Sequence, residues 1–132
     1  MNNLQLFAQD DTYKGQTADF ADAYYVIVHP KGTLMWDAGL SEGLVGLPEP
    51  YTSPDGNFSV SRPDSLVNQL RTIGMSPEDI DYLALSHTHF DHSGHAEALP
   101  NATWLVQEAE YDWVLSPEME AQQPDMYNAV ND

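Results

Sequence analysis

The sequence has no cysteine, only four lysine or arginine residues, and no long apolar run. Without cysteine, disulfides and thiolate ligands are excluded, so any metal must be held by nitrogen and oxygen atoms. No segment is long enough to cross a bilayer. The first residues, MNNLQLFAQDD, lack the basic segment and apolar stretch of a secretory signal. We therefore predict a cytoplasmic protein with no membrane partner.

The charge balance excludes a further class of partner. The chain has 21 acidic residues against four basic ones, which gives a formal net charge of -17. Such a surface repels the phosphates of nucleic acids. Because the acidic residues are scattered along the chain, they indicate a solvated surface and not an acidic tail. We predict no nucleic-acid partner.

The apolar pattern predicts strands and helices in alternation, which is typical of a layered α/β domain. Strands are expected at 24–28, 33–36, 82–85 and 102–107, and helical segments at 63–73, 77–79, 96–99 and 108–116. Pro63 suits a first helical turn and Gly74 a helix end. Residues 41–61 are predicted to be a long loop and residues 117–132 a polar tail. At 132 residues the chain is one domain, or a piece of a larger one.

The stretch SHTHFDHSGH, residues 86–95, holds four of the five histidines, directly after the apolar strand at 82–85. A lone histidine is usually a surface or hydrogen-bonded core residue, but four imidazoles beside a carboxylate suit a divalent cation. His87 and His89 are two residues apart, so in an extended segment they point to the same side. Asp91 and His92 follow where the chain turns into a helix. The spacing therefore predicts two adjacent metals, one for each pair.

The sequence HTHFDH matches the His-x-His-x-Asp-His motif that is the hallmark of the metallo-β-lactamase fold. The stretch VHPKGTLMWDAGL resembles the first motif of that superfamily, with Asp37 at a strand end. The stretches IGMSPEDIDYLALSHTHFDHSG and LPNATWLVQEAEYDW are similar to the N-acyl homoserine lactonase branch, the quorum-quenching lactonases. The resemblance runs from about Tyr24 to Trp113 and implies an αββα sandwich.

The resemblance also implies a ligand set. His87 and His89 are expected to bind the first metal, and Asp91 and His92 the second. The two divalent ions are expected to be zinc, although manganese, iron and cobalt accept the same ligands. Asp37 is expected behind the ligands as a brace for the motif loop. The alternative is that Asp37 only closes the turn after its strand.

The activity that the resemblance implies is hydrolysis of a small-molecule lactone or ester. A hydroxide bridging two metals would attack the carbonyl carbon, and Asp91 would carry the proton to the leaving alkoxide. Three alternatives stay open. They are a thioesterase of the glyoxalase II type, an organophosphate hydrolase, and a metal-binding fragment that is catalytically incomplete.

The chain departs from the family pattern after His95, where no further histidine follows. The resemblance would require a third histidine, a metal-bridging carboxylate and a last histidine. We therefore expect the N-terminal half of the sandwich, with one sheet face uncovered and prone to association. A homodimer that supplies the missing layer is an alternative.

Five further residues are not expected to be metal ligands. His95 is expected at the surface or behind the ligands. Trp36, Trp104 and Trp113 are expected in the core. Phe58 is expected to be an ordinary aromatic residue of the long loop, and the alternative is that it lines an acyl-chain pocket.

Overall fold

The computed structural model of the chain describes residues 1–122, so residues 123–132 of the predicted polar tail lie outside the described part. The strands are β1 (Tyr25–His29), β2 (Gly32–Trp36), β3 (Tyr51–Thr52), β4 (Ser59–Val60), β5 (Tyr82–Ala84) and β6 (Thr103–Leu105). The helices are α1 (Leu66–Thr72), α2 (Phe90–Ser93), α3 (Glu108–Val114) and α4 (Pro117–Gln122). Short 3₁₀ turns lie at Leu4–Phe7, Asp11–Tyr13, Glu42–Leu44, Pro77–Asp79 and Ala96–Ala98. None of the helices within residues 1–122 is long and apolar enough to cross a membrane.

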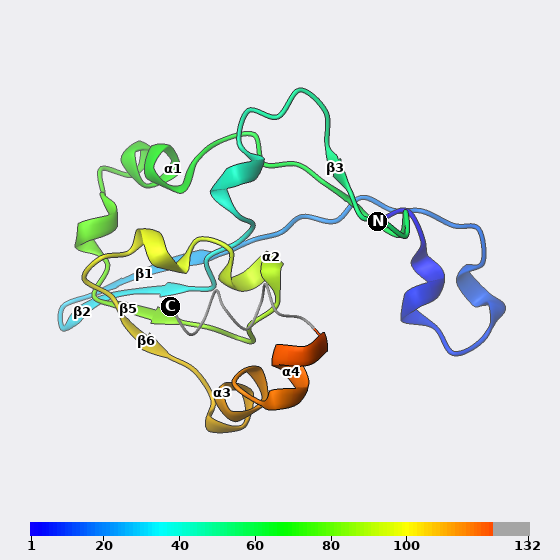
Figure 1. Cartoon of the computed structure of the whole chain (residues 1–132). Helices are drawn as coiled ribbons and strands as arrows, with labels where there is room; N and C mark the ends of the chain where they lie inside the picture. Colours follow the sequence, from blue (N-terminus) through cyan, green and yellow to red (C-terminus); the bar gives the residue numbers. More distant parts are fainter. Residues whose placement is uncertain (123–132) are drawn as a thin grey trace.

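Four strands form one sheet in the order β1-β2-β5-β6 (Figure 1). The pair β1 and β2 is an antiparallel hairpin, and β2, β5 and β6 run parallel to one another. Parallel neighbours need a crossover, and α1 supplies the crossover between β2 and β5. The predicted layered α/β fold is confirmed.

One face of this sheet carries the core. Met35 of β2 and Leu83 of β5 are paired in register and are fully buried. They pack in one apolar cluster with Leu66 and Leu70 of α1. Each buried side chain of this size contributes about 1.5–3 kcal/mol through burial alone. The sequence therefore specifies this face by alternating apolar residues in the strands and a helical stripe in α1.

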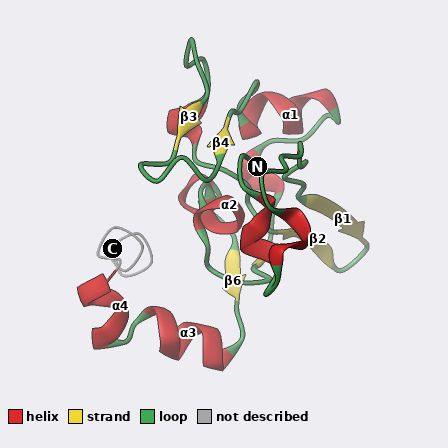
Figure 2. Ribbon diagram, turned by 90° about the vertical axis from the view of Figure 1, so that its right-hand side faces the viewer, coloured by secondary structure: helices red, strands yellow, loops and turns green. Residues whose placement is uncertain are grey.

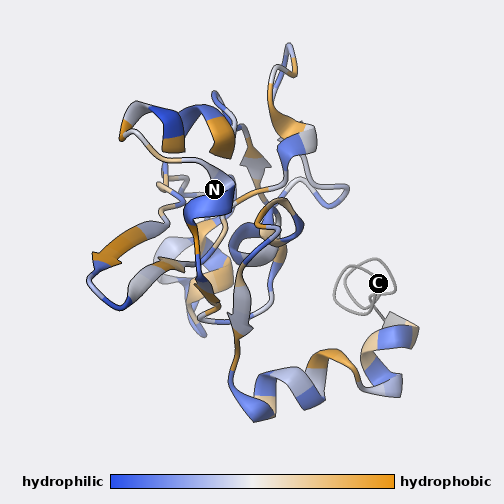
Figure 3. Ribbon diagram, turned by 90° about the vertical axis from the view of Figure 1, so that its left-hand side faces the viewer, coloured by the Kyte–Doolittle hydropathy of each residue, from blue (hydrophilic) through white to orange (hydrophobic). Residues whose placement is uncertain are grey.

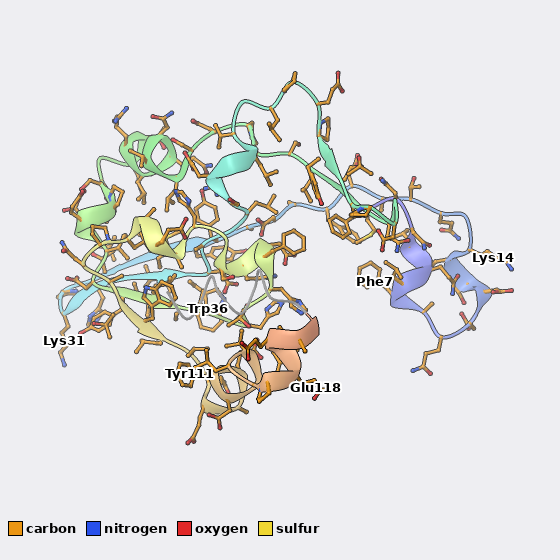
Figure 4. All side chains as sticks on the ribbon, viewed as in Figure 1. Phe7, Lys14, Lys31, Trp36, Tyr111 and Glu118 are labelled. Atoms are coloured by element: carbon orange, nitrogen blue, oxygen red, sulfur yellow. The ribbon has the colours of Figure 1, made fainter. Side chains whose placement is uncertain are left out.

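The opposite face is open, and the expectation for the three tryptophans is wrong. Trp36 is 43% exposed because the pleat of β2 turns it away from Met35 and α1 (Figure 4). The other two tryptophans lie elsewhere. Trp104 pairs in register with Leu83 on the core face but sits on the edge strand β6 and is 39% exposed, and Trp113 on α3 is 41% exposed. Ile27 of β1 is also exposed, and Figure 3 shows the hydrophobic character of that strand. Among residues 1–122, the face that carries Trp36 and Ile27 is thus exposed and apolar, as expected for a half sandwich.

The ends of α1 are set by local hydrogen bonds. Its start is not at Pro63 as predicted, because the Ser65 side chain caps the helix by accepting from the Asn68 amide. The predicted end at Gly74 is confirmed by its φ of 76°. The Gly74 amide donates to Arg71 O and the Met75 amide to Leu70 O, both at 3.0 Å, as in a Schellman motif.

The segment 41–61 holds more structure than the predicted loop. It contains the Glu42–Leu44 turn and the two-stranded hairpin β3-β4, which stands away from the main sheet (Figure 2). The backbone amides of Asn2 and Asn3 both donate to Asn57 O, at 2.8 and 3.1 Å. These bonds join the N-terminal arm to the hairpin, a long-range pairing that the local sequence does not encode.

The loops after β2 and β5 are joined by backbone hydrogen bonds. Asp37 N donates to Ala84 O, Ala38 N to His92 O and Gly94 N to Gly39 O, at 2.9, 2.6 and 2.9 Å. A side-chain carbon at Gly94 would lie 2.5 Å from Ser41 N and 2.6 Å from Phe90 O. Since both are backbone atoms, the close approach requires glycine.

We predict that Gly94→Ala destabilises the fold by about 1–3 kcal/mol, the usual range for overpacking. Gly43→Ala is the matched control, because its new methyl group would meet only Ser41 Oγ, at 3.6 Å. Urea denaturation measures both free energies of unfolding. Equal stabilities for the two variants would contradict the close approach.

Candidate metal centre

The motif residues lie at the carboxyl ends of two neighbouring parallel strands. Trp36 of β2 pairs with Ala84 of β5, so Asp37 and Ser86 leave the sheet side by side. Ligand sites of open α/β sheets gather at this edge. The parallel pairing is therefore what brings together residues almost 50 positions apart.

Asp37 is the buried anchor of this edge, only 4% exposed. Its Oδ1 accepts from the Ser86 amide at 2.7 Å, and its Oδ2 accepts from Ser86 Oγ at 2.9 Å. Its φ of 60° places it in the left-handed region, where a non-glycine residue costs about 1–3 kcal/mol. The surrounding hydrogen bonds hold the strained backbone in place.

The same carboxylate orients the imidazoles. His92 Nδ1 lies 2.9 Å from Asp37 Oδ2, and His87 Nδ1 lies 3.1 Å from Ser86 Oγ. A neutral imidazole that donates through Nδ1 keeps its lone pair on Nε2. Both rings therefore turn their Nε2 atoms away from Asp37.

Three of the predicted ligands come together. The ligand atoms of His87, Asp91 and His92 all lie within 4.8 Å of one another, and His92 Nε2 lies 3.7 Å from Asp91 Oδ2. His89 is outside this group of three but contacts it, since its Nδ1 lies 3.1 Å from His87 Nε2. The two predicted pairs are thus both adjacent. The rings of His87 and His92 join them, with centroids 4.0 Å apart and planes tilted by 48°.

This donor set fits divalent cations. Imidazole nitrogen and carboxylate oxygen bind zinc at about 2.0–2.2 Å, so one ion reaches two donors that are 3.7 Å apart. Metal-ligating histidines usually donate their other ring nitrogen to a carboxylate, a carbonyl or water. Here Nδ1 of His92 lies against the Asp37 carboxylate and Nδ1 of His87 against the Ser86 hydroxyl. The chemistry of the cluster supports the predicted metal site.

The electrostatics of the cluster favour unprotonated ligands. Burial lowers the pKa of His87, and the neighbouring charges of His92 and His89 lower it further. Metal ligation requires a neutral imidazole. His87 is therefore in the binding-competent form over a wider pH range than a free histidine.

No sequence pattern marked Glu110, on α3, which contacts the motif loop. Its Oε1 accepts from the Thr88 amide at 2.8 Å and from Thr88 Oγ1 at 2.7 Å. Burial alone would raise the pKa of Glu110, but these hydrogen bonds and the charges of His87 and His89 outweigh it and lower the pKa. Only the fold brings Glu110 to Thr88, 22 residues away.

The cluster opens onto a groove of ≈ 1240 Å³ between the motif loop and the N-terminal arm. His89, Asp91 and His92 lie on its polar side. Phe58 lines the groove and stacks on Phe90, with ring centroids 5.5 Å apart, which agrees with the pocket-lining alternative for this residue. The arm contributes Leu6, Phe7 and Phe20 to the opposite wall. The groove therefore combines a metal-ligand cluster with an apolar, aromatic wall.

His95 is buried behind the motif, 5% exposed, as one of its two expected placements allowed. Its Nε2 lies 3.2 Å from Glu42 Oε2. Burial lowers the pKa of His95, and the charge of Glu42 opposes only part of that effect. His95 thus joins the end of the motif loop to the start of segment 41–61.

Comparison with known proteins decides the family. The profile of the metallo-beta-lactamase superfamily matches residues 17–130 of the sequence. The chain belongs to this superfamily. Its matched region carries both Asp37 and the histidine motif, and the sheet that holds them is the fold expected from the resemblance.

Similar proteins include lactonases. The chain is 34% identical over 98 residues to N-acyl homoserine lactonase AttM of Azorhizobium caulinodans, covering 72% of this chain and 37% of that protein. It is 32% identical over 98 residues to N-acyl homoserine lactonase AiiA of Bacillus thuringiensis subsp. kurstaki, covering 71% and 39%. The chain therefore spans less than half the length of these relatives.

A solved structure with a similar backbone has a product bound. It is an N-acyl homoserine lactone hydrolase with N-hexanoyl-L-homoserine bound at the catalytic metal centre. The TM-score is 0.57 and the identity 31%, over 72% of this chain and 40% of that one. The likeness extends from sequence to backbone.

We predict that Asp37→Ala destabilises the protein by about 2–4 kcal/mol, because it removes buried hydrogen bonds and leaves alanine in a left-handed conformation. Asp37→Asn should cost less than half as much, since asparagine tolerates that conformation and keeps one acceptor oxygen. Urea denaturation of both variants tests this order. An equal loss would contradict the role given to the backbone conformation.

We also predict a pH-dependent contribution from His95. Its folded pKa lies below the ordinary value of 6.5, so between the two values the unfolded chain binds more protons. The free energy of unfolding therefore falls as the pH drops through this window. In His95→Gln the fall between about pH 7.5 and about pH 5.5 should be smaller than in the parent. Identical pH profiles would rule the effect out.

Proposed function

We propose that the chain forms the metal-binding part of a hydrolase that opens the ring of an N-acyl homoserine lactone. The observation that carries this proposal is the His87, Asp91 and His92 cluster at the side of an apolar, aromatic groove. Such a groove suits a neutral ligand with a small polar head and an apolar tail. The relatives with this activity support the choice of substrate.

In this proposal His87 and His89 hold one divalent ion, and Asp91 and His92 hold a second. Zinc is the first candidate, and the same donors accept manganese, iron or cobalt. When bound, such ions supply Lewis acidity, which lowers the pKa of water and polarises a carbonyl oxygen. Asp37 keeps His92 in the required orientation through its 2.9 Å contact with Nδ1.

Residues of the chain supply proton transfer and the surface that contacts the acyl chain. Ring opening adds one water across the ester C–O bond of the lactone, and the leaving alkoxide must take up a proton. Asp91 faces the groove and is the carboxylate placed to carry that proton. Phe58 and Phe90 offer an apolar surface that contacts the acyl chain and excludes water from it. No side-chain nucleophile is required.

The charge of the chain bears on the alternatives. With a net charge of -17, the protein repels anionic substrates such as a glutathione thioester, whereas an acyl homoserine lactone is neutral. Because the chain spans 37% of the length of AttM, this activity is proposed together with the further ligands that the resemblance implies. The cytoplasm remains our proposed location, from the lack of cysteine.

We predict that complete metal removal abolishes lactone hydrolysis and that Asp91→Asn lowers kcat by about 10²–10⁴-fold, the usual share of general acid–base catalysis. Asp112→Asn on α3 is the matched control and should be unaffected, since it lies outside the groove. Native mass spectrometry reads the metal content of each sample. Lactone hydrolysis that persists after complete metal removal would contradict the mechanism.

The substrate class is tested in the same assay. N-hexanoyl homoserine lactone, a glutathione thioester and an organophosphate ester are supplied in parallel to the zinc-loaded chain. Preferential turnover of the lactone supports the proposal. Turnover of the thioester or the organophosphate alone would assign the site to the corresponding alternative, and zinc binding without any turnover would leave a metal-binding module.

A further inference from the structure

Thr88 lies between the two predicted ligands His87 and His89, and it is almost completely buried, 2% exposed. Its amide and its hydroxyl both donate to the same oxygen, Oε1 of Glu110. Its carbonyl oxygen accepts from Ser93 Oγ at 3.1 Å. Every polar group of Thr88 therefore has a partner, and the partners come from both sides of the motif.

We propose that Glu110 is a positioning residue for the metal motif, acting through Thr88. This inference rests on the proposed function only in requiring that the motif binds a divalent cation. Glu110 does not touch the ligands in this role. Its effect is to fix the backbone from which His87 and His89 project.

The geometry of an extended segment explains how this works. Successive side chains point to opposite sides, so holding Thr88 inward makes His87 and His89 point outward together. The Thr88 bonds to Glu110 are 2.8 and 2.7 Å long, in the range of charge-assisted hydrogen bonds, which are about twice as strong as neutral ones. Without them the Thr88 amide and hydroxyl would be buried and unsatisfied.

The position of Glu110 in the fold makes it a rigid support for Thr88. It belongs to the first turn of α3, which follows the strand β6, and β6 pairs in parallel with β5. The motif loop also leaves the sheet from β5. Glu110 and Thr88 are thus carried by neighbouring strands, whereas Asp37 reaches the loop from β2, on the other side of β5.

The test measures affinity for Co²⁺ alone, in the 132-residue chain, by the visible absorption that reports ligand geometry. Three variants are compared with the parent: Glu110→Ala, Glu110→Gln, and the control Glu108→Ala on the same helix. Glu110→Ala should bind Co²⁺ about 10–100-fold more weakly, the usual cost of losing a partner behind the ligands. Glu110→Gln should recover most of this loss, because its amide oxygen still accepts from Thr88. Glu108→Ala should match the parent.

Circular dichroism shows which variants are folded. If Glu110→Ala does not fold, Glu110→Gln and Thr88→Val carry the test, since the valine variant loses only the hydroxyl bond. It should bind Co²⁺ more weakly than the parent, with an altered absorption spectrum.

Three results would overturn the proposal. They are a folded Glu110→Ala with affinity within about twofold of the parent, a glutamine variant no better than the alanine one, and parent-like binding by both Glu110→Gln and Thr88→Val. A parent chain that takes up no Co²⁺ overturns the metal centre as well. Tight Co²⁺ binding without lactone turnover refutes only the proposed substrate and leaves the role of Glu110 intact.

Discussion

The site depends on the hydrogen bonds that the buried carboxylate of Asp37 makes. It accepts from the backbone and the hydroxyl of Ser86 and lies 2.9 Å from a ring nitrogen of His92. Those contacts fix Ser86, the second residue after β5, and one imidazole beyond it. A free carboxylate in water would gain little from the same partners, but in a buried position each bond also removes a desolvation penalty. The left-handed backbone of Asp37 is tolerated because so many contacts determine it.

The motif loop is held from two directions with different chemistry. On the β2 side, Asp37 acts on Ser86 and on the ring of His92. On the β6 side, Glu110 acts on the backbone of Thr88. Between the two anchors, the imidazoles of His89 and His92 line the groove. In a chain with a net charge of -17, the carboxylates of Asp37 and Glu110 are stabilised by the hydrogen bonds they accept. Asp91 lines the groove instead, where a cation would neutralise it.

The sequence predicted the parts of the fold that local patterns encode. The strand β5, the Gly74 helix end and the histidine loop all follow from residues that are near one another in the chain. The position of Asp37 at a strand end was also readable, because its motif resembles that of a known superfamily. Glu110 was not readable, because its role depends on the pairing of β5 with β6 and on the direction in which α3 leaves the sheet. The three tryptophans were misplaced for a related reason: their hydrophobicity does not reveal which face or edge of a sheet they occupy.

The parallel pairing of β2 with β5 has a kinetic consequence. Asp37 is 49 residues from Ser86 and 55 from His92, so the contacts of Asp37 that orient the cluster close long stretches of chain. Contacts of such separation form late and slow the folding of a domain. A nascent or unfolded chain therefore carries the histidines without their arrangement. A peptide containing only residues 86–95 would bind metal as a flexible chelator, whereas the folded chain presents nitrogen atoms whose directions were settled when the central strands joined.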